Sequence, residues 1–186
     1  MSYYDHTVLS FQNQVREKDF RQAWILWEKS AGSLRHRWLK VLIALLFLTV
    51  IFFFLPGYRA HYATSFVPIC GIALLIAFIF YQIFFKIRMA EDEADRIFGS
   101  NRLLGQPENI TITREGYTIK GGYESLKGYW AEAAQCLESE AFYAVTGGPE
   151  RPLLILCKKD IPPERMEEFG GKMKSIFAAR YHRVMR

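Results

Sequence analysis

The stretch from Trp38 to Leu55, WLKVLIALLFLTVIFFFL, decides how the rest of the chain is interpreted. Its only charged residue is Lys40, which lies near the start. A helix over these 18 residues is about 27 Å long, close to the ~30 Å hydrocarbon thickness of a bilayer. The ammonium group of Lys40 can reach the membrane interface along its aliphatic stem. The stretch therefore predicts a membrane-spanning helix.

A second apolar stretch, Phe66 to Phe85, contains no charged residue and follows after a short polar loop. A chain of 186 residues is too short to enclose two helices that are apolar on every face. We therefore expect a transmembrane hairpin over 38–85, with spans 38–55 and 66–85 and an outer loop 56–65. Residues 1–37 precede it, and a folded domain over 86–186 follows it.

Basic residues flank the hairpin at both of its chain ends: Arg35, Arg37, Lys40, Lys86 and Arg88. The connecting loop has only Arg59. By the positive-inside rule, both termini are expected in the cytoplasm of a multi-pass protein of the inner cell membrane. Three cysteines without close spacing agree with a reducing compartment.

Neither span has an acidic residue, an arginine or a histidine in its central part. Transporters and proton relays keep such groups because their chemistry requires them. The hairpin is therefore interpreted as an anchor or an assembly element. Ala73 and Ala77 either admit a neighbouring helix or simply face lipid. The net charge of +5 is modest, and no basic stripe interleaved with aromatics predicts a nucleic-acid partner.

The helix of the second span is expected to continue to about Gly99 or Gly105, after which the pattern changes to strands. Residues 110–119 alternate apolar and polar side chains around a turn, and a further strand is expected around 125–129. A pair of strands is expected at 135–139 and 141–147, with a turn at 138–140, and a buried strand is expected within 151–159. Helical spacing follows from Pro163 to Tyr181. The predicted class is an α+β membrane protein, with a small antiparallel sheet capped by a C-terminal helix. Within residues 1–37, a strand is predicted at 6–15 and a helix at 17–30, and whether that strand joins the later sheet stays open.

The layout and several segments resemble the YcxB-like family of small bacterial membrane proteins. The segments are Gly128-Tyr129-Trp130 with the following AEAAQCLESEAFYAV, the strand LLILCKKDIPP and the helix ERMEEFGGKMKSIF. The chain departs from the family at Cys157, where members often have proline. The resemblance implies a domain similar to a pleckstrin-homology (PH-like) fold and no catalytic residues.

No sequence motif for catalysis is present, and the four histidines are isolated from one another. The acidic run Glu91–Asp95 fits a solvated helix face better than a metal site. The chain is therefore predicted to be no enzyme and to use no cofactor and no metal.

Six residues are candidate contacts to lipid or to a protein partner: Lys172, Lys174, Arg180, Arg183, Arg186 and Trp130. The basic ones could contact anionic headgroups or belong to a helix that merely covers the sheet. Trp130 is either a core residue or an interface hot spot.

The leading hypothesis is a PH-like domain at the cytoplasmic face that binds a protein partner or forms a homo-oligomer. The alternatives are a lipid- or ligand-sensing module and an accessory or pore-forming subunit.

Overall fold

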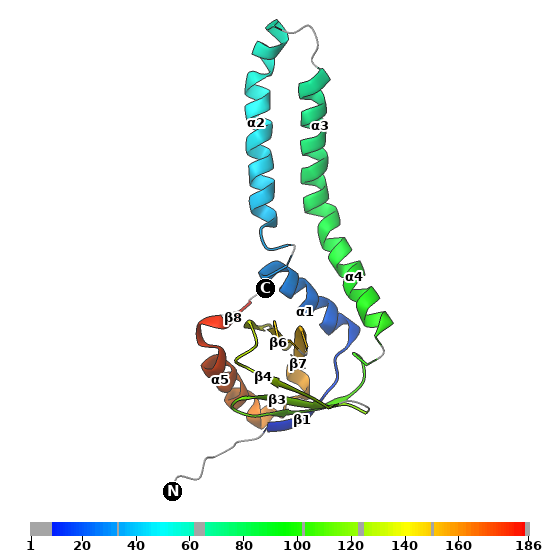
Figure 1. Cartoon of the computed structure of the whole chain (residues 1–186), viewed down its shortest axis with the longest axis vertical. Helices are drawn as coiled ribbons and strands as arrows, with labels where there is room; N and C mark the ends of the chain where they lie inside the picture. The colour runs from blue at the N-terminus through cyan, green and yellow to red at the C-terminus, as the bar shows by residue number, and fades with distance from the viewer. Residues whose placement is uncertain are drawn as a thin grey trace. The chain divides into compact units, whose positions relative to one another are not determined.

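The computed structural model describes residues 9–32, 34–61, 66–101, 103–122, 125–149 and 151–184. The chain divides into two compact units, which we call the hairpin unit, residues 28–93, and the domain unit, residues 1–27 with 94–186 (Figure 1). The hairpin unit is thus an insertion in the sequence of the domain unit. The question left open by the sequence is answered, because the N-terminal strand belongs to the domain.

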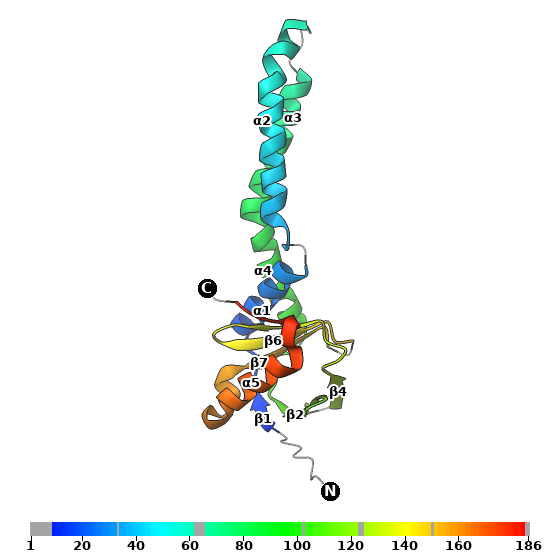
Figure 2. The same cartoon turned by 90° about the vertical axis from the view of Figure 1, so that its left-hand side faces the viewer.

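The hairpin unit consists of two long helices that lie side by side (Figures 1 and 2). Helix α2 spans Arg37–His61, so the first six residues of the expected loop are helical. Helix α3, Phe66–Phe80, continues through a π-helical turn, Tyr81–Phe85, into α4, Lys86–Ser100. The helix therefore continues past the predicted span to Ser100, as expected, with Gly99 in its last turn.

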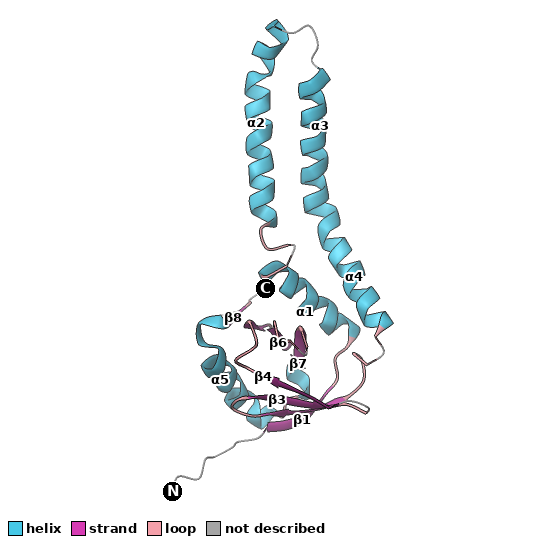
Figure 3. Ribbon diagram, viewed as in Figure 1, coloured by secondary structure: helices cyan, strands magenta, loops and turns pink. Residues whose placement is uncertain are grey.

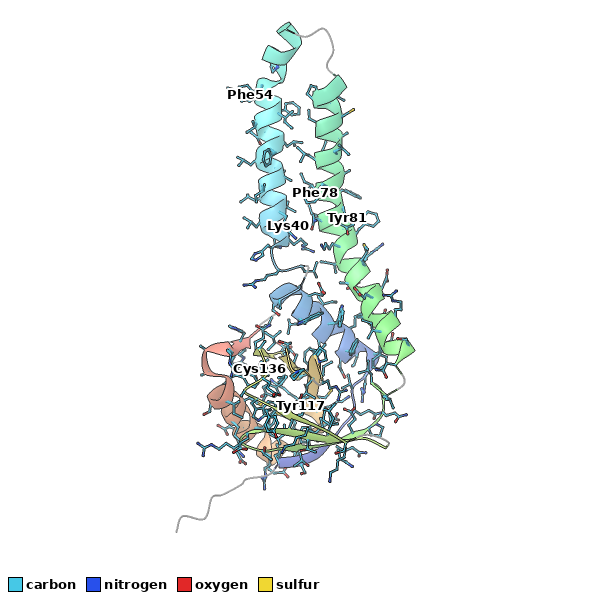
Figure 4. All side chains as sticks on the ribbon, in the orientation of Figure 1. Lys40, Phe54, Phe78, Tyr81, Tyr117 and Cys136 are labelled. Atoms are coloured by element: carbon cyan, nitrogen blue, oxygen red, sulfur yellow. The ribbon has the colours of Figure 1, made fainter. Side chains whose placement is uncertain are left out.

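Both helices are long and apolar enough to cross a membrane. In the apolar windows of the two helices, only 11% and 6% of the residues are buried. Large side chains such as Phe53 and Leu74 are 80% and 72% exposed, and side chains project from both helices along their length (Figure 4). A core helix of a soluble protein would bury such side chains.

The domain unit contains two four-stranded sheets (Figure 3). The first sheet has the order β1-β2-β3-β4, from Leu9–Asn13, Glu108–Ile112, Gly116–Lys120 and Ser125–Tyr129, and is antiparallel. The second has the order β7-β6-β5-β8, from Leu153–Cys157, Phe142–Thr146, Gln135–Glu138 and Tyr181–Arg183. In the second sheet, β8 pairs with β5 in parallel and the other pairs are antiparallel.

The core lies between the two sheets and is closed by helix α5, Met166–Phe177. Ile110 and Ile112 from the first sheet meet Leu154 and Leu156 from the second. The alternate residues of the second sheet, such as Phe142 and Ile155, form another core cluster on its opposite face. Helix α1, Glu17–Ser30, covers that face with Phe20 and Ala23. Both faces of the second sheet are buried, which explains its unbroken apolar runs.

The α+β class is confirmed, but the prediction of a single antiparallel sheet capped by a final helix is corrected in two respects. The described residues form two sheets, and a strand follows the C-terminal helix. Strand β8 has three residues, too few for a periodic pattern to be recognised. The number of sheets depends on which strands pair, and alternation within a strand does not encode pairing.

Candidate interaction site around the C-terminal helix

Trp130, expected as a core residue or a contact residue, lies in the core with 2% of its surface exposed. Its indole Nε1 donates to the carbonyl oxygen of Thr113 at 3.0 Å. Its ring lies between those of Tyr117 and Phe177, with centroid distances of 5.0 and 5.8 Å. Its side chain is therefore not available to a lipid or a partner.

The Gly-Tyr-Trp segment has a steric explanation at Gly128. This residue pairs with Tyr117 in the β3–β4 ladder. A Cβ atom at Gly128 would lie 2.4 Å from Cζ of Tyr117, so only glycine leaves room for that ring. The Tyr117 ring, whose position inside the domain is labelled in Figure 4, can then pack against Trp130.

An open groove of about 970 Å³ runs beside Trp130 along one side of α5. Besides Trp130, its lining residues are Arg114, Glu115, Tyr129, Ala131, Glu132, Lys172, Ser175, Ile176 and Arg180. The structure thus brings together Lys172 and Arg180 from the predicted set and adds Arg114. It also places the carboxylates of Glu115 and Glu132 among these cations, so the groove carries both signs of charge.

The basic residues of the predicted set also make contacts within the domain. Lys172 Nζ lies 3.2 Å from Glu168 Oε1, and Arg180 Nη1 donates to the carbonyl oxygen of Ala133 at 2.5 Å. Lys174 Nζ lies 6.0 Å from the centre of the Tyr181 ring. Arg183 belongs to β8, and Arg186 lies outside the described residues. The set therefore splits between the groove and the edge of the second sheet.

At that edge, the buried carboxylate of Glu138 gathers three side chains. Lys158 Nζ contacts Oε1 at 2.7 Å, and the Tyr181 hydroxyl donates to Oε2 at 2.5 Å. Arg183 Nε lies 3.8 Å from the same oxygen. Lys158 Nζ also lies 4.7 Å above the centre of the Tyr143 ring. This cluster joins β5 to the C-terminal segment.

The pKa values in this cluster follow from burial and from the partners. Burial alone would raise the pKa of Glu138, but hydrogen bonds from Lys158 and Tyr181 outweigh it and lower the pKa below its ordinary value. Burial, together with the hydrogen bond to Glu138, raises the pKa of the Tyr181 phenol. Glu138 is therefore an ionised structural carboxylate, and Tyr181 remains a donor.

Glu138→Gln should lower stability at neutral pH by about 1–2 kcal/mol, because the amide keeps the shape and loses the charge-assisted hydrogen bonds. The pKa of Glu138 is depressed in the folded state, so its stabilisation is complete above 4.5 and is lost as the pH falls towards the folded-state value. Thermal unfolding of the full-length protein should show wild type and variant converging at acid pH. Glu140→Gln, an exposed control in the adjacent turn, should have the stability of wild type at every pH. A stability difference between wild type and Glu138→Gln that does not change with pH would contradict the role of the Glu138 charge.

The two thiols of the domain are structural. Burial raises the pKa of Cys136 and of Cys157 to about 12, so neither provides a thiolate nucleophile near neutral pH. They lie in the core clusters on opposite faces of the second sheet. Among the described residues, no group of three or more histidine, cysteine or acidic side chains is placed to hold a metal ion.

A smaller cavity of about 360 Å³ lies in the domain unit, with mostly apolar walls. Phe20 and Trp24 of α1, Ile97 of α4 and Leu153 of β7 contribute to it. The charged residues on its wall, Arg151 and Glu108, pair with each other at 2.7 Å.

Two polar residues with key contacts were not singled out from the sequence. Glu138 was included only in a predicted turn, and Asn13 in a predicted strand. The signal that could have identified them is a polar residue at a position of a strand that the pattern assigns to the buried, otherwise apolar face. Asn13 Nδ2 donates to the Ile155 carbonyl at 3.0 Å, and its Oδ1 accepts from the Cys157 N–H at 2.8 Å.

Compared with known proteins, the chain matches no protein-family model and no curated protein.

Proposed function

We propose that this protein is a non-enzymatic, membrane-anchored interaction module whose domain binds a protein partner at the cytoplasmic face. The observation that carries the proposal is the apolar hairpin, with its large side chains exposed along two helices. Lipid is the environment in which such exposure is favourable. The basic residues at both ends of the hairpin favour an inner-membrane orientation with both termini in the cytoplasm.

The architecture of the domain supports a PH-like fold of the YcxB-like kind. Two small sheets pack face to face, and one helix closes the core between them. The resemblance of the sequence implies the same arrangement. A fold of this kind serves here as a scaffold, because burial keeps the thiols of Cys136 and Cys157 protonated and the carboxylate of Glu138 is engaged in structural contacts.

The binding face in this proposal is the groove along α5. Its cations lie beside Glu115 and Glu132, which an anionic lipid surface would repel. A protein surface can complement both signs of charge at once. Anchoring also makes weak contacts sufficient, because confinement to the membrane raises the effective concentration of a co-resident partner.

The test begins with membranes washed in alkaline carbonate, in which the full-length protein should stay in the pellet. A photo-crosslinking residue in place of the exposed Ser175, which lines the groove, should then form an adduct with a protein. Arg114→Glu should lower the adduct yield about tenfold by placing like charge against the partner. Lys120→Glu is the matched control, since it makes the same charge change on the same sheet outside the groove.

Release of the protein by carbonate would contradict the anchor. Adducts with lipid alone, or equal yields from the two charge variants, would contradict the groove as a protein-binding face.

A further inference from the structure

Strand β8 is an unusual edge strand. It has three residues, Tyr181–Arg183, and pairs with β5 in parallel. It reaches this edge directly after α5, through the short turn Ala178–Arg180 (Figure 2). His182 and Arg183 are exposed. The edge of β5 therefore accepts a short extended segment, as sheet edges do in strand addition.

The segment is held by contacts that depend on its sequence. Arg180 binds the carbonyl oxygen of Ala133, and the Tyr181 hydroxyl binds the buried carboxylate of Glu138. The backbone N–H of Val184 donates to the Glu138 carbonyl oxygen at 2.8 Å. The edge thus recognises an arginine followed by a tyrosine, in addition to an extended backbone.

The turn that delivers the segment is strained. Ala178 has φ 43° and ψ −112°, and it is the one non-glycine residue with positive φ among the residues the structure describes. Such a conformation disfavours any residue with a Cβ atom. The docked segment therefore combines good contacts with an unfavourable hinge, a combination that favours exchange of the segment between copies.

We propose that the β5 edge is a strand-acceptor site for a second copy of this chain, filled in trans by that copy's segment 178–184. The partner is argued from the site itself, because its carboxylate and carbonyl match the arginine and tyrosine of this chain's own segment. The inference rests on the proposed function in one respect, since it relies on membrane confinement to keep two copies close.

The hinge at Ala178 makes the free energy differ between two arrangements: segment 178–184 docked on its own chain, and the same segment docked on a second copy. The contacts of β8 with β5 are the same within one chain and between chains, so they cancel in the comparison. The strain at Ala178 is present only where the chain turns back on its own edge. Ala178→Gly should lower the exchanged fraction about fivefold, because glycine adopts positive φ readily. Ala178→Val should raise it, because a branched side chain increases the strain.

The experiment uses the full-length protein in membranes, with two differently tagged copies expressed together. The photo-crosslinking amino acid p-benzoylphenylalanine replaces His182, whose backbone pairs with Leu137 of β5. An adduct within one chain keeps the monomer mass, and an adduct between chains has twice that mass and carries both tags. The control crosslinking position is Gln12, which is exposed on the first sheet. The control hinge variants are Ala179→Gly and Ala179→Val.

We expect doubly tagged adducts from position 182 that map to β5. The doubly tagged fraction should fall with Ala178→Gly, rise with Ala178→Val, and stay unchanged in the Ala179 variants. Tyr181→Phe should lower both adducts together and leave their ratio unchanged. Adducts at monomer mass in every hinge variant would overturn the proposal, as would an adduct with a different protein. In either of those cases, a protein adduct at Ser175 in carbonate-resistant membranes would leave the proposed function standing.

Discussion

Replacing Trp130 with alanine is expected to lower the free energy of unfolding of the domain by about 3–5 kcal/mol. The ring is 2% exposed and packs against Tyr117 and Phe177. Its loss leaves a cavity between the first sheet and α5, and the carbonyl of Thr113 loses its hydrogen bond. Urea unfolding of the full-length protein in detergent, followed by circular dichroism, measures the change.

The adjacent Tyr129 provides the control, because it is 42% exposed and a surface truncation changes stability by about 0.5 kcal/mol or less. Trp130→Phe should recover part of the loss, since phenylalanine fills part of the space but cannot donate to Thr113. If Trp130→Ala left the unfolding curve unchanged and abolished the Ser175 adduct, Trp130 would be an interface residue and the core assignment would be wrong.

The second large effect is expected at Asn13. Asn13→Ala should destabilise the domain by about 2–4 kcal/mol, because two buried hydrogen bonds are lost and two backbone groups keep no partner. Asn13 is 1% exposed, and its amide contacts the Ile155 carbonyl and the Cys157 N–H. It is thus the polar contact by which β1 of the first sheet holds β7 of the second.

Asn13→Asp separates the two bonds, since the carboxylate still accepts from Cys157 but cannot donate to Ile155. Its cost should be no smaller than that of alanine, because a buried charge is added. Gln12→Ala is the control, as Gln12 neighbours Asn13 and faces solvent. Equal unfolding midpoints for Gln12→Ala and Asn13→Ala, measured by urea unfolding of the full-length protein, would contradict this role.

Most individual elements could be predicted, because each is encoded by local periodicity. The helix expected at 17–30 and the strand expected at 125–129 have the observed bounds. The strand expected within 151–159 is observed as Leu153–Cys157. The pairing of β1 with β2 could not be predicted, because alternation shows that a strand has a buried face and does not identify its neighbour. The division of the strands into two sheets depends on the same missing information.

The candidate site was predictable to a smaller extent. Clustered basic residues near the C-terminus were visible in sequence, but the carboxylates that neighbour them come from distant segments. Glu138 meets Tyr181, 43 positions away, only because β8 turns back onto β5. Trp130 was left between two roles because an aromatic residue favours cores and interfaces alike. Only packing distinguishes these roles, and it places the side chain in the core.

The position of the hairpin within the chain also has a consequence for biosynthesis. Ser10 and Thr111, neighbours in the first sheet, are 101 positions apart, and both apolar helices are translated between them. The ribosome must therefore complete the hairpin before β1 can meet β2, so native topology forms late. Because α2 and α3 form a hairpin, the chain leaves the second helix near the end at which it entered the first. The effective loop between β1 and β2 is therefore shorter, and the entropic cost of pairing these strands is lower. A nascent chain that stops before β2 leaves Leu9 and Phe11 without their native cover, and would be a natural substrate for chaperones.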